Sequence, residues 1–200
     1  MFALIESGSI TKYLNGNKGI TLGDTQYPRA IYTLWSAAER EAIGIYEVVF
    51  DDSNKKDEQW YINTNQSFAF ANSTVTATYG TATAKAHADA NFTEEDEDNG
   101  LGTEGELKSR GLKYNLIKTV KSEAAGELTK TDWYITRNAE KSTAIPSAIT
   151  THRDLVRSRQ ATMETQITNA SNTPALETLY TYTKDSDGVT SRPLAEIPNL

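Results

Sequence analysis

The pattern of hydrophobic and polar positions changes its period near the middle of the chain. In the first part, apolar residues form short strand-like runs separated by Gly, Asn, Ser and Asp, which are turn residues. These runs cover residues 2–5, 10–14, 20–22, 45–50, 67–71 and 74–79. In the second part, apolar residues recur at intervals of three and four, which is typical of helices with one buried face. The pattern therefore predicts an α+β chain with a small β-rich N-terminal module and a helical C-terminal part.

One short helix is expected among the strands of the first module. Ser36 can cap a helix, and Glu39 stands three residues later, which is the spacing of a capping box. Gly44 follows at a position typical of a helix end. We therefore predict a helix between residues 36 and 44, inside a β-rich module of residues 1–80.

The helical region is predicted over residues 107–183. Its strongest pattern indicates a long amphipathic helix from about residue 147 to 170, in which the recurring positions are His152, Leu155, Val156, Arg159, Met163 and Ile167. An earlier helix is expected to begin near Leu107 and to stop at Gly126, and a short one to run from Pro174 to Tyr180.

Two segments are too poor in apolar residues to predict a packed fold. Residues 81–106 are first rich in Ala and Thr and then acidic, so we interpret them as a linker. Residues 184–200 contain two prolines and little periodicity, and we expect an extended tail that is ordered only against a docking partner.

The composition favours a protein that associates with others. Hydrophobic residues make up 38% of the chain, which is low for one thick core, so we expect burial against copies of itself or a partner. The net charge is -7 and the basic residues are scattered, which argues against nucleic-acid binding. Glu6 interrupts the opening apolar run and no long apolar run follows. We therefore predict a soluble protein without a membrane span, made in the cytoplasm.

Residues that could act in catalysis or bind a metal are few, and they do not cluster in the sequence. The chain has no cysteine, and His87 and His152 lie in no known catalytic spacing, so we predict a non-enzyme without cofactor or metal. A calcium loop remains an alternative, because five residues occupy its positions one, three, five, six and twelve: Glu95, Glu97, Asn99, Gly100 and Glu106. Position one is Glu and position eight is Gly102, both departures from the pattern, so a solvated linker is favoured.

Aromatic residues and the face of the long helix are the candidate contact sites. Trp and Tyr commonly anchor protein interfaces. The predicted contact residues are Trp133, Tyr134, Leu155, Val156, Arg159, Met163 and Ile167. Packing of these residues inside one chain is the alternative. Another alternative is a glycan-binding module that stacks sugars on Trp60, Tyr61 or Trp133.

Three stretches carry a resemblance to a known group of proteins. The first comprises residues 23–28 (GDTQYP), 34–40 (LWSAAER) and 43–46 (IGIY), and the second comprises Tyr61 with residues 74–79 (TVTATY). The third and most specific comprises residues 131–140 (TDWYITRNAE), 144–146 (AIP), Arg153 and Arg157. Together they resemble small bacteriophage tail proteins encoded near tail fibres, which include tail-fibre, baseplate-associated and tail-fibre assembly proteins. Asn138 departs from that pattern, where Lys is usual.

The resemblance implies a structural protein of the virion tail, at the tail fibre or baseplate, that mediates subunit attachment and oligomerisation. Its expected partners are other phage tail subunits, including copies of itself in a homo-oligomer. Two alternatives stay open: a tail-fibre assembly chaperone absent from the virion, and a module that binds a host surface glycan. The resemblance implies no catalytic residue.

Overall fold

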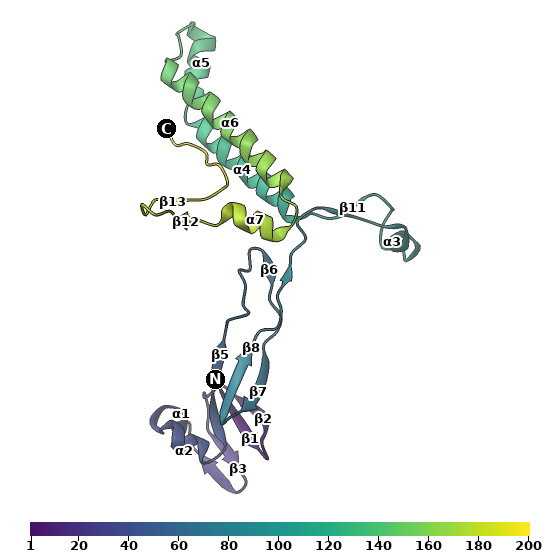
Figure 1. Ribbon diagram of the computed structural model, residues 1–200, viewed down its shortest axis with the longest axis vertical. Coiled ribbons are helices and arrows are strands. Elements are labelled where there is room, and N and C mark those ends of the chain that lie inside the picture. Colours follow the sequence, from purple (N-terminus) through teal and green to yellow (C-terminus); the bar gives the residue numbers. More distant parts are fainter. The chain divides into compact units, whose positions relative to one another are not determined.

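The computed structural model describes residues 1–200 and divides the chain into two compact units (Figure 1). The first unit, Met1–Thr83, is built mainly of strands, and the second, Ala84–Leu200, mainly of helices. This confirms the predicted α+β class with a β-rich N-terminal part and a helical C-terminal part.

A curled five-stranded sheet forms the centre of the first unit, in the order β2-β1-β5-β8-β7. Its strands are β1 (Phe2–Glu6), β2 (Ser9–Leu14), β5 (Ile45–Asp51), β7 (Ser67–Ala71) and β8 (Thr74–Thr78). β1–β2 and β7–β8 are antiparallel hairpins, and β5 lies antiparallel to β1 and parallel to β8. The sheet curls until its two edge strands meet, where the rings of Tyr13 and Phe68 lie 4.8 Å apart.

Both faces of this sheet bury apolar side chains, because neighbouring residues of a strand point to opposite faces. One cluster contains Ala3, Val48, Val75 and Ala77. The other contains Leu4, Leu14, Ile20, Ile31, Tyr32 and Ile45 and is covered by short elements. These elements are β3 (Ile20–Leu22), β4 (Thr25–Tyr27), α1 (Ile31–Leu34) and α2 (Ala37–Glu41). The unit therefore divides its limited apolar content between two thin layers.

The predicted capping box at α2 is confirmed. Ser36 Oγ accepts from the Glu39 amide, and the Glu39 carboxylate accepts from the Ser36 amide at 2.8 Å. Gly44 ends this segment with φ +79°, and a Cβ at its position would lie 2.7 Å from the Ile5 carbonyl oxygen. Only glycine combines this backbone angle with so close an approach to β1.

The acidic segment that we interpreted as a linker is folded instead. It contains β10 (Ala90–Asn91), α3 (Glu94–Asp98) and β11 (Leu107–Ser109), and β10 pairs with β11. We call residues 89–110 the acidic arm. Polar contacts hold it: Thr93 and Asp96 form a capping box at α3, Lys108 pairs with Asp96 at 2.6 Å, and Arg110 pairs with Asp89. Composition did not predict this fold because the arm depends on ion pairs and hydrogen bonds more than on apolar burial.

Two long helices pack lengthwise in the second unit (Figure 1). α6 (Ser147–Asn169) confirms the long predicted helix, and α7 (Thr173–Tyr180) begins within one residue of its predicted start. α4 (Leu112–Thr129) differs from the prediction at both ends, because Leu107 lies in β11 and the helix continues through Gly126. A helical glycine costs only about 1 kcal/mol relative to alanine, which packing against α6 offsets. α5 (Asp132–Lys141) was not predicted.

The C-terminal tail is docked on the helices of its own chain. After the short hairpin of β12 (Thr183–Lys184) and β13 (Thr190–Ser191), Leu194 is fully buried and its amide donates to the Leu179 carbonyl at 3.0 Å. The Gln166 amide donates to the Pro193 carbonyl and accepts from the Ala195 amide, both at 2.9 Å. Our expectation of a tail ordered only by an external partner is therefore wrong, because α6 and α7 supply the docking surface.

One further pair of short strands includes the residues at the boundary between the two units in the sequence. β6 (Tyr61–Ile62) pairs with β9 (Thr83–Ala84). No helix of the chain is both long enough and apolar enough to cross a membrane.

Candidate interaction surface

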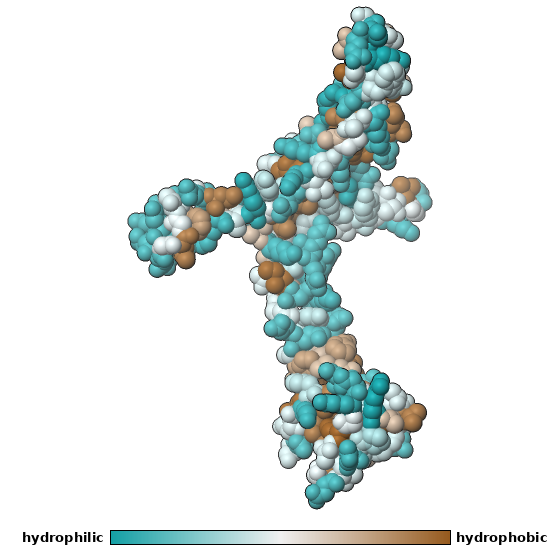
Figure 2. Space-filling model, turned by 180° about the vertical axis from the view of Figure 1, so that it is seen from behind, coloured by the Kyte–Doolittle hydropathy of each residue, from teal (hydrophilic) through white to brown (hydrophobic).

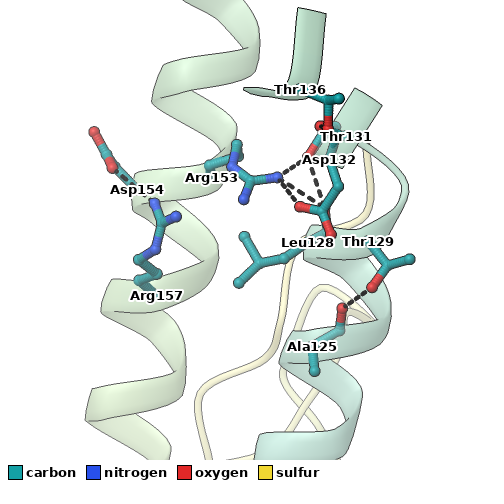
Figure 3. A network of polar contacts seen from close by, with 9 residues as sticks. All are labelled: Ala125, Leu128, Thr129, Thr131, Asp132, Thr136, Arg153, Asp154 and Arg157. Atoms are coloured by element: carbon teal, nitrogen blue, oxygen red, sulfur yellow. Dashed lines mark hydrogen bonds and ion pairs between the residues drawn. The ribbon is translucent and has the colours of Figure 1, made fainter. Parts of the chain in front are cut away.

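A buried arginine fixes the start of α5 (Figure 3). Arg153 on α6 donates from one guanidinium nitrogen to the Leu128 carbonyl at 2.8 Å, to Thr131 Oγ1 at 2.6 Å and to Asp132 Oδ1 at 2.9 Å. The Leu128 carbonyl belongs to the last turn of α4, where helix carbonyls lack partners in the helix and a positive charge is favourable. Arg153 therefore joins the end of α4 and the beginning of α5 to α6.

α5 itself buries none of its ten residues. Trp133, Arg137 and Lys141 follow one another at intervals of four and share one side of the helix. The Arg137 guanidinium carbon lies 5.0 Å from the centre of the Trp133 ring and 5.4 Å from that of Tyr134. We call Trp133, Tyr134, Arg137 and Lys141 the α5 face. It offers two aromatic rings and two cations to the surroundings.

The α5 face has the chemistry of a binding surface. The Trp133 side chain is 60% exposed, and neither Arg137 nor Lys141 pairs with a carboxylate of the chain. The Nε atom of Arg137 is shielded from water and has no hydrogen-bond partner. Trp, Tyr and Arg are the residues that most often dominate binding energy at protein interfaces. The face is therefore the strongest candidate interaction surface of the second unit.

The seven predicted contact residues fall into two groups. Val156, Met163 and Ile167 are fully buried within the chain, on the side of α6 that packs on α4. Their side chains are already packed, so they cannot contact a partner while the helix pair is intact. The group that a partner can reach consists of Trp133, Tyr134, Leu155 and Arg159.

Leu155 and Arg159 lie beside the docked tail, away from the buried side of α6. Together with residues 190–198 they line a shallow hollow of about 350 Å³. Its lining contains the oppositely charged residues Arg192 and Glu196, which pair with each other at 3.3 Å. Figure 2 shows that apolar residues on the visible face form small separate patches among polar ones. The hollow is therefore a weaker candidate than the α5 face.

Two residues of the α5 face, Arg137 and Lys141, were missed by the sequence reasoning. Their spacing from Trp133 would have identified them, had residues 132–141 been recognised as a helix. Thr131 and Asp132 are residue types common at a helix start, but the segment is strongly polar, and without a clear apolar period these signals alone do not predict a helix.

The structure also bears on the sugar and calcium alternatives. Trp60 and Tyr61 are buried, so neither ring can stack on a sugar, and Trp133 alone of the three proposed rings is available. Glu95 and Glu97 lie in α3, whereas the calcium pattern needs both in a loop that wraps around the ion. No group of three or more His, Asp or Glu side chains is placed to hold a metal ion.

A buried carboxylate connects α4, α6 and the tail. Glu127 on α4 accepts a hydrogen bond from Lys130 and, at 2.9 Å, one from the Leu200 amide, and its Oε1 lies 3.2 Å from His152 Nε2. The hydrogen bond from Lys130, followed by those from Leu200 and His152, lowers the pKa of Glu127 below its ordinary value, against the opposing effect of burial. The ionised form of Glu127 is therefore favoured by folding.

We expect Glu127→Gln to weaken the pH dependence of stability. Because the pKa of Glu127 is lower in the folded chain, its contribution is present above the unfolded pKa of about 4.3 and disappears as the pH falls through the folded pKa. Thermal unfolding between pH 7 and pH 3 should show a lower Tm for Glu127→Gln at neutral pH and convergence with the native protein in acid. A constant difference across this range would contradict the assignment.

Comparison with known proteins identifies no relative of the chain. No family model, no curated protein and no solved structure matches the chain.

Proposed function

We propose that this chain is a non-catalytic structural subunit of a bacteriophage tail, at the tail fibre or baseplate, that attaches to neighbouring tail subunits through the α5 face. The observation that carries the proposal is a helix that has no fully buried residue and exposes Trp133, yet is held in place by the buried Arg153. Exposed aromatic residues on a firmly anchored helix gain apolar burial only by binding. Such an arrangement suits attachment to another subunit.

The residues that carry the resemblance to phage tail proteins gather around this helix. Thr131, Asp132 and Arg153 form one hydrogen-bonded network, and Trp133, Tyr134 and Arg137 form most of the α5 face. One part of the motif therefore positions the helix and another part is exposed on it. A motif that both positions a helix and exposes side chains on it is expected of a binding site. This supports a binding role for the residues that carry the resemblance.

The proposal predicts that the chain is a component of the finished particle. Mass spectrometry of purified virions should detect it, and Trp133→Ala should reduce its incorporation strongly. Truncation of a Trp that is a hot spot of an interface costs about 2 kcal/mol or more, which corresponds to roughly thirtyfold weaker binding. Phe50→Ala is the matched control, because Phe50 is a half-exposed ring of the first unit, and it should be incorporated normally.

Other outcomes would overturn the proposal and indicate a different role. A chain that is made during infection but absent from virions would be an assembly chaperone. Particles that incorporate Trp133→Ala normally but no longer attach to the host would indicate that Trp133 binds a surface glycan.

A further inference from the structure

Charge is distributed unevenly within the second unit. The acidic arm contains eight acidic and two basic residues. Both basic residues are already used, since Lys108 pairs with Asp96 and Arg110 pairs with Asp89. Glu94, Glu95 and Asp98 are exposed, and their carboxylates have no partner in the chain. The arm therefore presents free negative charge.

The first-turn position of Glu94 suits the helix dipole, but the position of Asp98 and its spacing from Glu94 are unfavourable for α3. Glu94 and Asp98 are four residues apart on α3, so their like charges lie on the same side of the helix and repel. Asp98 also lies in the last turn, where the helix dipole favours a basic residue and α3 has none. A cation brought by another molecule would relieve both unfavourable terms.

The α5 face offers the complementary charge. Arg137 and Lys141 are four residues apart, as Glu94 and Asp98 are, and Trp133 lies beside them. Glu140, three residues after Arg137 and one before Lys141, is the only carboxylate on that side of the helix, so the face keeps a net positive charge. On the arm, Leu101 is largely exposed and offers an apolar contact for the ring of Trp133.

The arm and the α5 face of one chain are held apart by α4. The arm leads into the first residue of α4, Leu112, and α5 follows its last residue, Thr129. A helix of 18 residues is about 27 Å long. The two complementary surfaces thus lie at opposite ends of a rigid element, and a contact between them requires two copies of the chain.

We propose that the α5 face of one copy binds the acidic arm of a second copy, with Arg137 and Lys141 against Glu94 and Asp98 and with Trp133 against Leu101. The inference rests on the proposed function in taking the α5 face as the docking surface, and it names a copy of the chain as the neighbouring subunit. Two different surfaces meet, so a pair of copies retains one free arm and one free α5 face, to which further copies can bind. The copies join head to tail, into a ring or an open row.

Sedimentation velocity of the full chain tests this contact directly. Self-association should be seen at about 50 mM salt and should weaken at least tenfold at about 500 mM, where charges are screened over a few ångströms. The double variants Arg137→Glu/Lys141→Glu and Glu94→Lys/Asp98→Lys should each be monomeric, since each sets like charges against each other. An equimolar mixture should associate again, because each variant then meets a surface of opposite charge.

A control separates this contact from a general effect of charge. Lys12→Glu/Lys18→Glu changes the net charge as much as the α5 variant does, at exposed residues of the first unit that form no ion pair, and it should self-associate like the native chain. Circular dichroism should show that all variants remain folded. A native chain that stays monomeric at low salt, or a mixture that does not associate, would refute the head-to-tail contact.

The virion experiment distinguishes this inference from the proposed function. If the chain is incorporated into particles in a Trp133-dependent way but does not self-associate, the proposed function stands and the neighbour is a different subunit. If the chain self-associates as described but is absent from particles, the contact stands and the structural role in the tail fails.

Discussion

Replacement of Ile167 by alanine is expected to lower the free energy of unfolding of the second unit by about 3 kcal/mol. Ile167 is fully buried in the last turns of α6, on the side that packs on α4. The shorter side chain loses its transfer energy and leaves a cavity that the two rigid helices cannot close. Urea unfolding followed by far-UV circular dichroism, which is dominated by the helices, would measure the loss.

Leu155→Ala is the matched control on the same helix. Leu155 is 43% exposed, so the same measurement should show a loss of less than about 1 kcal/mol. The pair of variants also separates packing inside the chain from contact with a partner, the two roles that the sequence left open for these residues. Equal losses for both residues would contradict the packing of α4 on α6, because they would place both side chains in similar surroundings.

Local signals explain which elements were predictable from the sequence. The spacing of apolar residues gave α6 within a residue, and the capping box of Ser36 and Glu39 gave the start of α2. The alternation of Phe68 and Phe70 with Val75 and Ala77 gave the β7–β8 hairpin. In each case the residues that define the element lie close together in the sequence. A short stretch of sequence therefore suffices to predict the element.

The acidic arm and the tail were misjudged for the opposite reason. Asp96 pairs with Lys108 twelve residues away, and Leu194 is buried against a helix that ends before residue 181. Composition measures how much apolar surface a segment offers, but it does not show which polar groups meet after folding. Segments whose order depends on such distant pairs are therefore predicted as linkers and loose tails.

Periodicity predicted the buried side of α6 without saying what covers it. The same spacing of Val156, Met163 and Ile167 fits burial on α4 and burial on another subunit, and the structure places these residues within the chain. The Trp133–Tyr134 pair was selected for its aromatic character, and the structure leaves Trp133 exposed. The position of α5 depends on Arg153, 21 residues beyond Asp132, and no pattern in the sequence of α5 indicates that contact.

Arg153→Ala is expected to destabilise the second unit by about 2–3 kcal/mol, because it removes three charge-assisted hydrogen bonds from a largely buried guanidinium. The Leu128 carbonyl and Thr131 Oγ1 lose a charged partner, and Asp132 loses its ion pair. The half-exposed position of Asp132 keeps the loss below that of a fully buried pair. Urea unfolding measures this loss as it does that of Ile167→Ala.

The second readout is the mobility of α5, since Arg153 is the side chain that joins α6 to the start of that helix. Hydrogen exchange of the α5 amides should accelerate in Arg153→Ala, while the middle of α6 should remain protected. Arg157→Ala is the matched control, because Arg157 pairs with Asp154 on the exposed side of the same helix (Figure 3). It should cost less than about 0.5 kcal/mol and leave α5 exchange unchanged. Equal effects of the two variants would show that α5 is held by something other than the Arg153 network.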